Sequence, residues 1–211
     1  EVITFISILK ACGNRGSLDI GKKIHDEVNK LGLLGKDIVL GTAMMDMYVK
    51  CGLLVKSREV FCEIPVKNIE AWNSLIMGYA QLGQAKKVLH IFQKNIVDKG
   101  IMPNLVTFIL AISACSHAGR PQEGYYLYMV MSKDYNILPH LGHYCCMVDM
   151  LGRVGYLDDA ESMINEMPFE PDYVIYTTLL NACKMHDDVV RGERIAKLVF
   201  SMDTPNSESY I

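Results

Sequence analysis

The residues of this sequence that could perform chemistry are its seven cysteines and six histidines. One segment, His25-Asp26-Glu27, matches the H-x-E part of the zinc deaminase signature, in which histidine ligates zinc and glutamate moves protons. That signature also requires a later Pro-Cys-x-x-Cys segment, which supplies two thiolate ligands. No such segment follows in this sequence, so the ligand set is incomplete and we expect no metal.

The remaining cysteine arrangements suit packing better than ligation. Cys145 and Cys146 are adjacent, so their side chains point to different faces of a helix. Cys115-Ser116-His117 has no second group of ligands. The eleventh position of a repeat described below is a cysteine in three copies: Cys12, Cys115 and Cys183. Thiols at equivalent positions of stacked repeats lie too far apart for a disulfide, so we expect free cysteines in a reducing compartment.

Composition narrows the classes of function. The sequence contains no paired nucleophile and base and no glycine-rich phosphate loop, so we expect neither catalytic residues nor a cofactor in this segment. The formal net charge is −3 and the pI is near 6.1. Because phosphate contacts from Lys and Arg dominate nonspecific nucleic-acid binding, this charge argues against a strong nonspecific binder. No apolar run is long enough to cross a membrane, so we expect no membrane partner.

The elements that must position any functional side chain are pairs of short helices. Apolar residues of the segment 69–104 fall at helical spacing in two runs: Trp72, Leu75, Ile76 and Tyr79, then Val88, Leu89, Ile91 and Phe92. Gly83 separates the two runs, and Pro103-Asn104 follows them. This pattern predicts two antiparallel helices that cannot bury their apolar faces without similar neighbours.

The same layout occurs six times along the chain. The repeats start at Val2, Ile38, Ile69, Leu105, Leu141 and Tyr173, so their lengths by subtraction are 36, 31, 36, 36 and 32 residues. The fifteenth residue of each repeat suits a left-handed turn: Gly16, Gly52, Gly83, Gly119, Gly155 and Asp187. Five residues later, mostly small residues would let the second helix cross closely over the first: Gly21, Ser57, Val88, Gly124, Ala160 and Gly192. A period of this length, built of paired helices, predicts an all-α solenoid, a right-handed α–α superhelix.

We expect residues 1–211 to form a single solenoid without a linker. Its repeats are predicted at 2–37, 38–68, 69–104, 105–140, 141–172 and 173–206, and residues 207–211 resemble the start of a further repeat. The segment is therefore expected to be part of a longer solenoid. Since solenoids need polar end caps for solubility, we also expect end-to-end self-association through the last repeat.

Short motifs inside these repeats are distinctive. They include Ala71-Trp-Asn-Ser-Leu-Ile76, Met45-Asp-Met-Tyr-Val-Lys-Cys-Gly52, Ser113-Ala-Cys-Ser-His-Ala-Gly119, Met147-Val-Asp-Met-Leu-Gly-Arg153 and Leu179-Leu-Asn-Ala-Cys183. With these motifs the chain resembles the pentatricopeptide repeat family of plant organellar proteins, in the PLS subclass where ordinary, long and short motifs alternate. Repeats 2–37 and 105–140 resemble long motifs, 38–68 and 141–172 short motifs, 69–104 the ordinary motif, and 173–206 the first E motif.

The resemblance implies sequence-specific binding of single-stranded organellar RNA, which selects the target site for C-to-U editing. It places the protein in a plant mitochondrion or chloroplast, with the mitochondrion favoured. In this family the fifth residue of a repeat and its last residue read one base together. The matching pairs are Thr42 with Asn68 (adenine), Asn73 with Asn104 (a pyrimidine), and Cys145 with Asp172 (base undefined).

The resemblance also implies roles for other positions. Val39 and Val106, second in their repeats, suit packing on base faces, whereas the carboxylate of Glu70 at the same position does not. Lys50 and Arg153 are candidates for phosphate contacts. The long motifs carry isoleucine at the fifth position, Ile6 and Ile109, and are expected to space the array or to bind accessory editing proteins of the MORF/RIP type.

Other interpretations of the same residues stay open. Thr42 and Asn73 could be ordinary polar residues on an exposed helix face, and Asn68, Asn104 and Asp172 are expected to cap helices in any case. A second hypothesis is a tetratricopeptide-like scaffold that binds proteins. Its Trp-x-x-Leu-Gly signature matches at Trp72 and Leu75, although Ile76 replaces the glycine.

Overall fold

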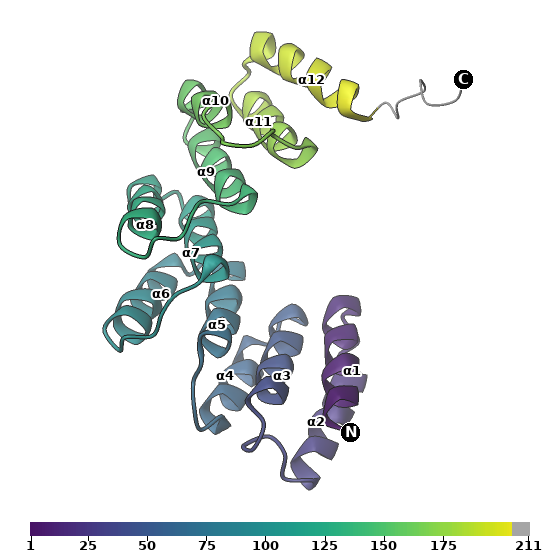
Figure 1. The fold of residues 1–211 in the computed structure, drawn as a ribbon. Helices are drawn as coiled ribbons and strands as arrows, with labels where there is room; N and C mark the ends of the chain where they lie inside the picture. Colours follow the sequence, from purple (N-terminus) through teal and green to yellow (C-terminus); the bar gives the residue numbers. More distant parts are fainter. Residues whose placement is uncertain (204–211) are drawn as a thin grey trace, which may run out of the picture. The chain divides into compact units, whose positions relative to one another are not determined.

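A computed structural model describes residues 1–203, so the predicted start of a further repeat at 207–211 lies outside the described residues. The regular elements of the described part are all helices and it contains no strand, which confirms the all-α prediction (Figure 1). The helices are α1 (Val2–Arg15), α2 (Leu18–Lys30), α3 (Ile38–Lys50), α4 (Leu54–Glu63), α5 (Ile69–Gln81), α6 (Ala85–His90), the π-helix η1 (Ile91–Val97), α7 (Leu105–His117), α8 (Pro121–Lys133), α9 (Leu141–Arg153), α10 (Leu157–Asn165), α11 (Tyr173–Met185) and α12 (Val189–Asp203). They group into two compact bodies, Glu1–Leu110 (the N-terminal body) and the residues from Ala111 onward (the C-terminal body).

The odd-numbered α-helices begin at the first residues of the six sequence repeats. The residue before four of these helices is an N-cap whose side chain accepts a hydrogen bond from the backbone N–H three residues later. These caps are Asp37, Asn68, Asn104 and Asp172, with distances of 2.9, 3.0, 3.1 and 3.0 Å. The capping expected for Asn68, Asn104 and Asp172 is therefore confirmed. Each cap satisfies a backbone donor that has no partner within its helix.

The turns between paired helices have the backbone conformation that the sequence predicts. The five glycines and Asp187 have φ angles between 56° and 84°, the left-handed region that an L side chain rarely adopts. In the first turn the N–H of Ser17 donates to the carbonyl of Cys12 over 2.9 Å, while the N–H of Gly16 donates to Gly13. This pair of hydrogen bonds is the Schellman motif, which satisfies carbonyls at the end of a helix.

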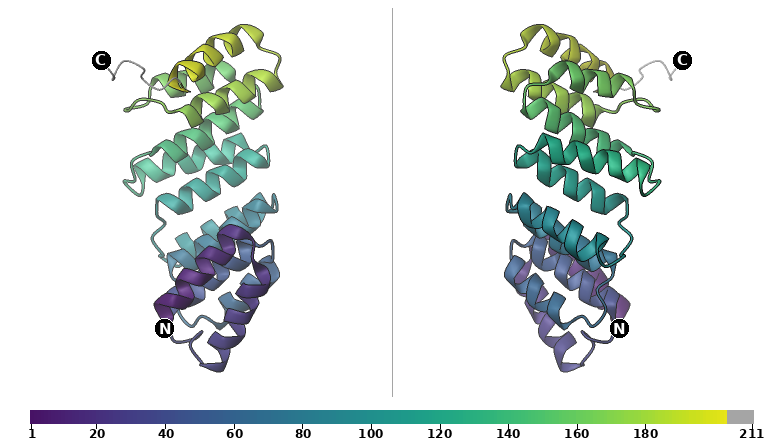
Figure 2. Two further views of the ribbon diagram at one scale, coloured as in Figure 1. Left: turned by 90° about the vertical axis from the view of Figure 1, so that its right-hand side faces the viewer. Right: turned by 90° about the vertical axis from the view of Figure 1, so that its left-hand side faces the viewer.

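Within each body the first helices of successive repeats pack side by side. In the N-terminal body α3 lies between α1 and α5, and α2 and α4 pair with α1 and α3 (Figure 1). In the C-terminal body α9 packs on α11, α10 on α9, and α12 on α11. The side views in Figure 2 show the helices of each pair running alongside one another. The three cysteines at the eleventh position, Cys12, Cys115 and Cys183, are buried as predicted, and all seven cysteines are free thiols.

The small residues of the second helices do allow close approach, but not only to their own partner helix. A Cβ on Gly21 would lie 2.6 Å from Sδ of Met47, which belongs to the first helix of the next repeat. A Cβ on Gly124 would meet Met150 of the next repeat at 2.4 Å and Cys115 of its own repeat at 3.2 Å. The prediction of a close crossing within one repeat was therefore too narrow, because these positions also face the following hairpin.

One irregular helix was not predicted. The second helix of the repeat 69–104 changes at Ile91 from an α-helix to the π-helix η1. Its end shows the wider turn, since Asp98 N–H donates to the Gln93 carbonyl over 2.9 Å. In an α-helix Ile91 and Ile96 would project about 140° apart, so one of them would leave the core. Both are buried here, which the wider π turn permits.

Candidate nucleic-acid interface

A groove of about 780 Å³ lies on the N-terminal body, lined by residues of α1, α3, α5 and the start of α7. Its lining consists of Lys10, Val39, Thr42, Ala43, Asp46, Asn68, Glu70, Asn73, Ser74, Met77, Asn104, Val106 and Leu110. We call it the repeat groove. Six of the residues predicted from sequence line it together: Thr42, Asn68, Asn73, Asn104, Val39 and Val106. These residues come from three consecutive repeats and occupy the second, fifth and last positions.

The two valines of the repeat groove, Val39 and Val106, are unusually exposed for apolar side chains. Val39 is 60% exposed and Val106 is 50% exposed, each on the first turn of its helix. Glu70 occupies the same position in the intervening repeat and is also exposed. The groove therefore offers two apolar surfaces on which the face of a base could pack, and a carboxylate between them.

One interpretation of the sequence expected Asn73 to be an ordinary polar residue on an exposed helix face. The structure shows instead that Asn73 is only 7% exposed. Its Nδ2 donates to Oδ1 of Asn104 over 3.1 Å, across the boundary between two repeats. The hydroxyl of Thr107 donates to Asn73 Oδ1 over 2.8 Å. The interpretation of Asn73 as a solvated surface residue is therefore wrong, since it belongs to a buried network at the floor of the repeat groove.

The pair Thr42 and Asn68 is held differently. The Thr42 hydroxyl donates to the carbonyl of Ile38 over 2.7 Å, so its proton is used within α3 and its oxygen is left as an acceptor. Asn68 Oδ1 accepts from Ala71 N–H over 3.0 Å, which leaves its amide nitrogen as a donor. The two side chains therefore present one acceptor and one donor to the repeat groove.

The third predicted pair lies in the C-terminal body. Cys145 is half-buried, and burial, assisted by the nearby charge of Asp172, raises the pKa of its thiol to about 11. The thiol is therefore protonated at neutral pH and is only a weak hydrogen-bond donor. Asp172 uses Oδ1 to cap α11 through Ile175 N–H.

The two candidate phosphate ligands are each engaged with a carboxylate one turn earlier. Lys50 Nζ lies 2.9 Å from Asp46 Oδ2 and also donates to Asn14 Oδ1 over 3.1 Å. Arg153 Nε lies 2.8 Å from Asp149 Oδ2. An RNA phosphate would have to share these cations with the carboxylates, which weakens each contact. Within the repeat groove itself the charged lining is one lysine and two carboxylates, so its field does not favour phosphate.

Sequence reasoning missed Thr107, which lies at the third helical position after the N-cap Asn104. Its hydroxyl accepts from Asn104 N–H over 3.1 Å, while Asn104 Oδ1 accepts from Thr107 N–H over the same distance. This reciprocal arrangement resembles a capping box, with threonine in the place of glutamate or glutamine. The spacing of Asn104-Leu-Val-Thr107 was the signal that could have indicated it.

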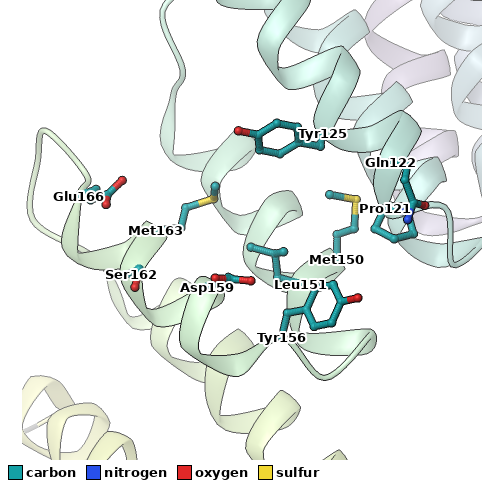
Figure 3. Close-up of a pocket in the computed structure, with 10 residues that line it drawn as sticks. All are labelled: Pro121, Gln122, Tyr125, Met150, Leu151, Tyr156, Asp159, Ser162, Met163 and Glu166. Atoms are coloured by element: carbon teal, nitrogen blue, oxygen red, sulfur yellow. The ribbon is translucent and has the colours of Figure 1, made fainter.

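A second groove, of about 660 Å³, lies on the C-terminal body among α8, α9 and α10 (Figure 3). We call it the tyrosine groove. The close-up shows Tyr125 and Tyr156 at its edges, with Met150 and Met163 between them and the carboxylates of Asp159 and Glu166 on one side. None of the residues that line it was predicted from sequence as a site residue.

The H-x-E segment has a structural role in this fold. His25 Nδ1 lies 2.7 Å from the Tyr48 hydroxyl, and burial lowers the pKa of His25, which favours the neutral imidazole. Across residues 1–203 no three His, Cys, Asp or Glu side chains gather closely enough to hold a metal ion. Among the described helices none is both long and apolar enough to cross a membrane.

Paired helices that repeat with a glycine turn define an α-helical repeat protein. The PPR repeat family model matches residues 42–69, 70–94, 106–135 and 142–170, which is more than half of the chain. The chain therefore belongs to the pentatricopeptide repeat family.

Relatives and solved structures agree with this assignment. The chain is 39% identical over its whole length to the pentatricopeptide repeat-containing protein At3g26782, mitochondrial, of Arabidopsis thaliana, and covers 32% of it. It is 40% identical to At1g08070, chloroplastic, of the same plant, with 99% of this chain and 28% of that protein covered. The chain thus spans about a third of the length of these relatives.

The crystal structure of PPR10 in complex with an 18-nt psaJ RNA element superposes with a TM-score of 0.79. The two chains are 19% identical, and the match covers 97% of this chain and 31% of PPR10. At this level of identity the likeness concerns the fold alone, and it confirms the predicted class, a helical-hairpin repeat of the α–α superhelix type.

Proposed function

We propose that this chain binds single-stranded RNA and that the repeat groove reads its bases. One observation carries the proposal: the fold gathers the second, fifth and last residues of consecutive repeats into one groove. Polar pairs there could meet the edge of an unstacked base while the exposed Val39 and Val106 pack on base faces. The RNA bound by PPR10, a protein of the same fold, agrees with this use of the hairpin repeat.

The donors and acceptors of the two pairs define the bases that each can recognise. Thr42 presents an acceptor and Asn68 a donor, which complements the N6 amino group and N1 of adenine. Asn73 and Asn104 retain amide N–H groups that can meet the acceptors of a pyrimidine. The chain is therefore expected to prefer an adenine followed by a pyrimidine.

The charge of the site determines how strong this binding is. The repeat groove contains two carboxylates and one lysine, and Lys50 is paired with Asp46. Since phosphate contacts dominate nucleic-acid affinity, we expect a dissociation constant on the order of micromolar or weaker, rising steeply with salt. Selectivity, rather than strength, is then the property that the repeat groove supplies.

We further propose that the complete protein selects sites for C-to-U editing in a plant organelle, with this chain as the C-terminal part of a PLS array and its first E motif. The mitochondrial and chloroplastic names of its relatives support an organellar location, and the mitochondrion is favoured. Because the chain spans about a third of these relatives, the deaminase chemistry is assigned to other parts of the protein or to a partner.

The test is a titration of short fluorescent RNA oligonucleotides with this chain. Fluorescence anisotropy measures the binding, and the titration is repeated at several salt concentrations. An oligonucleotide with adenine followed by a pyrimidine should bind more tightly than one with the two positions exchanged. Thr42→Ala and Asn73→Ala should each reduce affinity for the matched RNA about fivefold, the effect of one hydrogen bond. Thr178→Ala is the matched control, because Thr178 bonds only to the Val174 carbonyl on α11 of the other body. Equal binding of matched and exchanged RNA would contradict the proposal.

A second candidate function, the docking of an accessory editing protein of the MORF/RIP type, is favoured by the tyrosine groove. Tyr125 and Tyr156 are exposed there beside Met150 and Met163, and aromatic and methionine side chains are enriched in protein interfaces. α8 belongs to the long repeat 105–140, where such a partner is expected. The carboxylates of the groove repel phosphate and suit a basic segment of a protein instead.

This second function is tested with a purified accessory protein of that type. Tyr125→Ala combined with Tyr156→Ala should abolish its binding and leave RNA affinity unchanged. Tyr126→Ala is the matched control, because Tyr126 is exposed on the same helix without lining the groove. Unchanged protein binding by the double variant would exclude the tyrosine groove as the docking site.

A further inference from the structure

The amide orientations of Asn73 and Asn104 follow from one group that can only donate, the backbone N–H of Thr107. This N–H lies 3.1 Å from the Asn104 side chain, so the atom that it meets must be the oxygen. The group of Asn73 that lies 3.1 Å from this oxygen must then be its nitrogen. The remaining Asn73 atom is therefore the oxygen, and it accepts the Thr107 hydroxyl proton over 2.8 Å.

The Thr107 hydroxyl both accepts and donates a hydrogen bond in this network. Its oxygen accepts the backbone N–H of Asn104 over 3.1 Å, so its proton is available for an acceptor. The Asn73 oxygen, at 2.8 Å, is a closer acceptor than Asn104 Oδ1, at 3.1 Å. Thr107 is fully buried, so water does not compete for this proton.

We propose that Thr107 is a positioning residue for base choice, because it occupies the oxygen of Asn73 and leaves the pair Asn73 and Asn104 presenting mainly donors. The inference rests on the proposed function of the repeat groove. One N–H of Asn73 and both N–H groups of the Asn104 amide stay without a partner in the described residues. Adjacent acceptors on a base complement such a surface.

The two pyrimidines differ in this respect. Cytosine has two adjacent acceptors, N3 and O2, whereas uracil has a donor, N3–H, between its two acceptors. A donor that meets donors leaves both without a partner, which costs free energy at a buried site. With Thr107 in place, the repeat groove should therefore favour cytosine over uracil at the position read by Asn73 and Asn104.

The three other Asn and Asp caps that precede first helices have no hydroxyl at the equivalent position. Three residues after Asp37, Asn68 and Asp172 lie Leu40, Ala71 and Ile175, which donate only their backbone N–H groups to the cap. The Thr42 and Asn68 pair therefore has no counterpart of Thr107. The effect is local to one base position, which makes it separable from general RNA affinity.

The experiment compares two RNA oligonucleotides that differ only in having cytosine or uracil after the adenine, and the measured quantity is the ratio of their dissociation constants. Wild-type protein should prefer cytosine about fivefold, the value of one net hydrogen bond. In Thr107→Val the Asn73 amide loses the hydroxyl that fixes its orientation. It can then turn its oxygen toward uracil N3–H, so the ratio should fall to about one. Thr107→Ser retains the hydroxyl and should restore the preference, and Thr178→Val, a change on α11 of the C-terminal body, should not alter it.

The outcomes separate this inference from the proposed function. Wild-type protein that does not distinguish matched from exchanged RNA refutes the proposed function and the inference with it. Wild-type protein that distinguishes them, with an unchanged cytosine-to-uracil ratio in a folded Thr107→Val variant, refutes the role of Thr107 alone. If Thr107→Val does not fold, NMR of the wild-type chain decides. A Thr107 hydroxyl proton that is protected from exchange with water and lies close to the Asn73 side chain supports its role, and a hydroxyl proton that exchanges rapidly refutes it.

Discussion

Gly152 on α9 packs against Ala182 on α11, and replacing it by alanine should destabilise the chain. A Cβ at residue 152 would lie 2.5 Å from the Cβ of Ala182 on α11. Carbon atoms prefer a separation of about 3.5–4.0 Å, and an alanine side chain has no rotamer by which to move away. α9 and α11 would have to separate by on the order of 1 Å. That movement would also weaken the hydrogen bond of 2.8 Å between His186 Nε2 and the Gly152 carbonyl.

The magnitude follows from two opposing effects. Overpacking of a core costs about 1–3 kcal/mol, whereas alanine gains up to about 1 kcal/mol over glycine in helix propensity. Because no rotamer change relieves the 2.5 Å contact, we take the upper part of the overpacking cost, about 2–3 kcal/mol. Less about 1 kcal/mol for helix propensity, Gly152→Ala should lower the free energy of unfolding by about 1–2 kcal/mol. Gly192→Ala is the matched control, because a Cβ there would meet its nearest neighbour, Cys183 Cβ, at an ordinary distance of 3.7 Å. This variant should be more stable than wild type by about 0.5–1 kcal/mol.

Urea unfolding followed by circular dichroism measures both variants under the same conditions. The expected result is a lower midpoint for Gly152→Ala and a higher midpoint for Gly192→Ala. A midpoint for Gly152→Ala at or above that of wild type would refute the argument from close helix packing. A decrease of equal size in both variants would show that the loss of glycine itself, rather than the contact with Ala182, is responsible.

Three further predictions concern charge and exposed apolar surface. Replacing Glu70 by valine removes a carboxylate from the repeat groove and should raise RNA affinity about fivefold at low salt. The gain should become smaller as salt is added, because salt screens the charge. Anisotropy titrations measure this, and unchanged affinity would contradict it. Arg194 holds the pKa of Glu161 below its usual value of 4.5, so this interaction stabilises the fold above that pH and is lost as pH falls through the lowered pKa. Arg194→Gln should therefore lower thermal stability at pH 7, and the difference from wild type should vanish in acid; a pH-independent difference would exclude this cause. Val190 and Phe200 on α12 are 83% and 70% exposed, so the chain should self-associate at high concentration. The double variant Val190→Lys with Phe200→Glu should sediment as a monomer. Wild-type protein that is already monomeric at the same concentration would contradict the expectation.

Local features of this chain were predictable because each depends on a few neighbouring residues. A glycine at the fifteenth position of a repeat ends a helix through its own φ angle, and Asp187 does the same in the last repeat. Asn68, Asn104 and Asp172 cap helices through backbone groups three residues away. The pairing of Lys50 with Asp46 also had a local signal, since the two residues are four apart on one helix.

Other features depended on residues far apart in the sequence. Asn73 is buried because Asn104 and Thr107, more than thirty residues later, satisfy both ends of its amide. The π-helix buries both Ile91 and Ile96, and the core that receives them includes residues of other helices. The tyrosine groove is lined by residues of α8, α9 and α10. No local pattern specifies such arrangements, because they depend on how neighbouring hairpins pack.

The sequence alone therefore indicated the family, the residues at which the first helices begin and six of the residues that line the repeat groove. The tertiary structure decided which of their hydrogen-bonding groups remain free for a ligand. The physical reason is that a helix start or a left-handed turn is decided by backbone geometry within a few residues, whereas a donor is free or occupied according to what the next repeat places beside it. For Asn73 that neighbour is Thr107, and only the fold brings the two together.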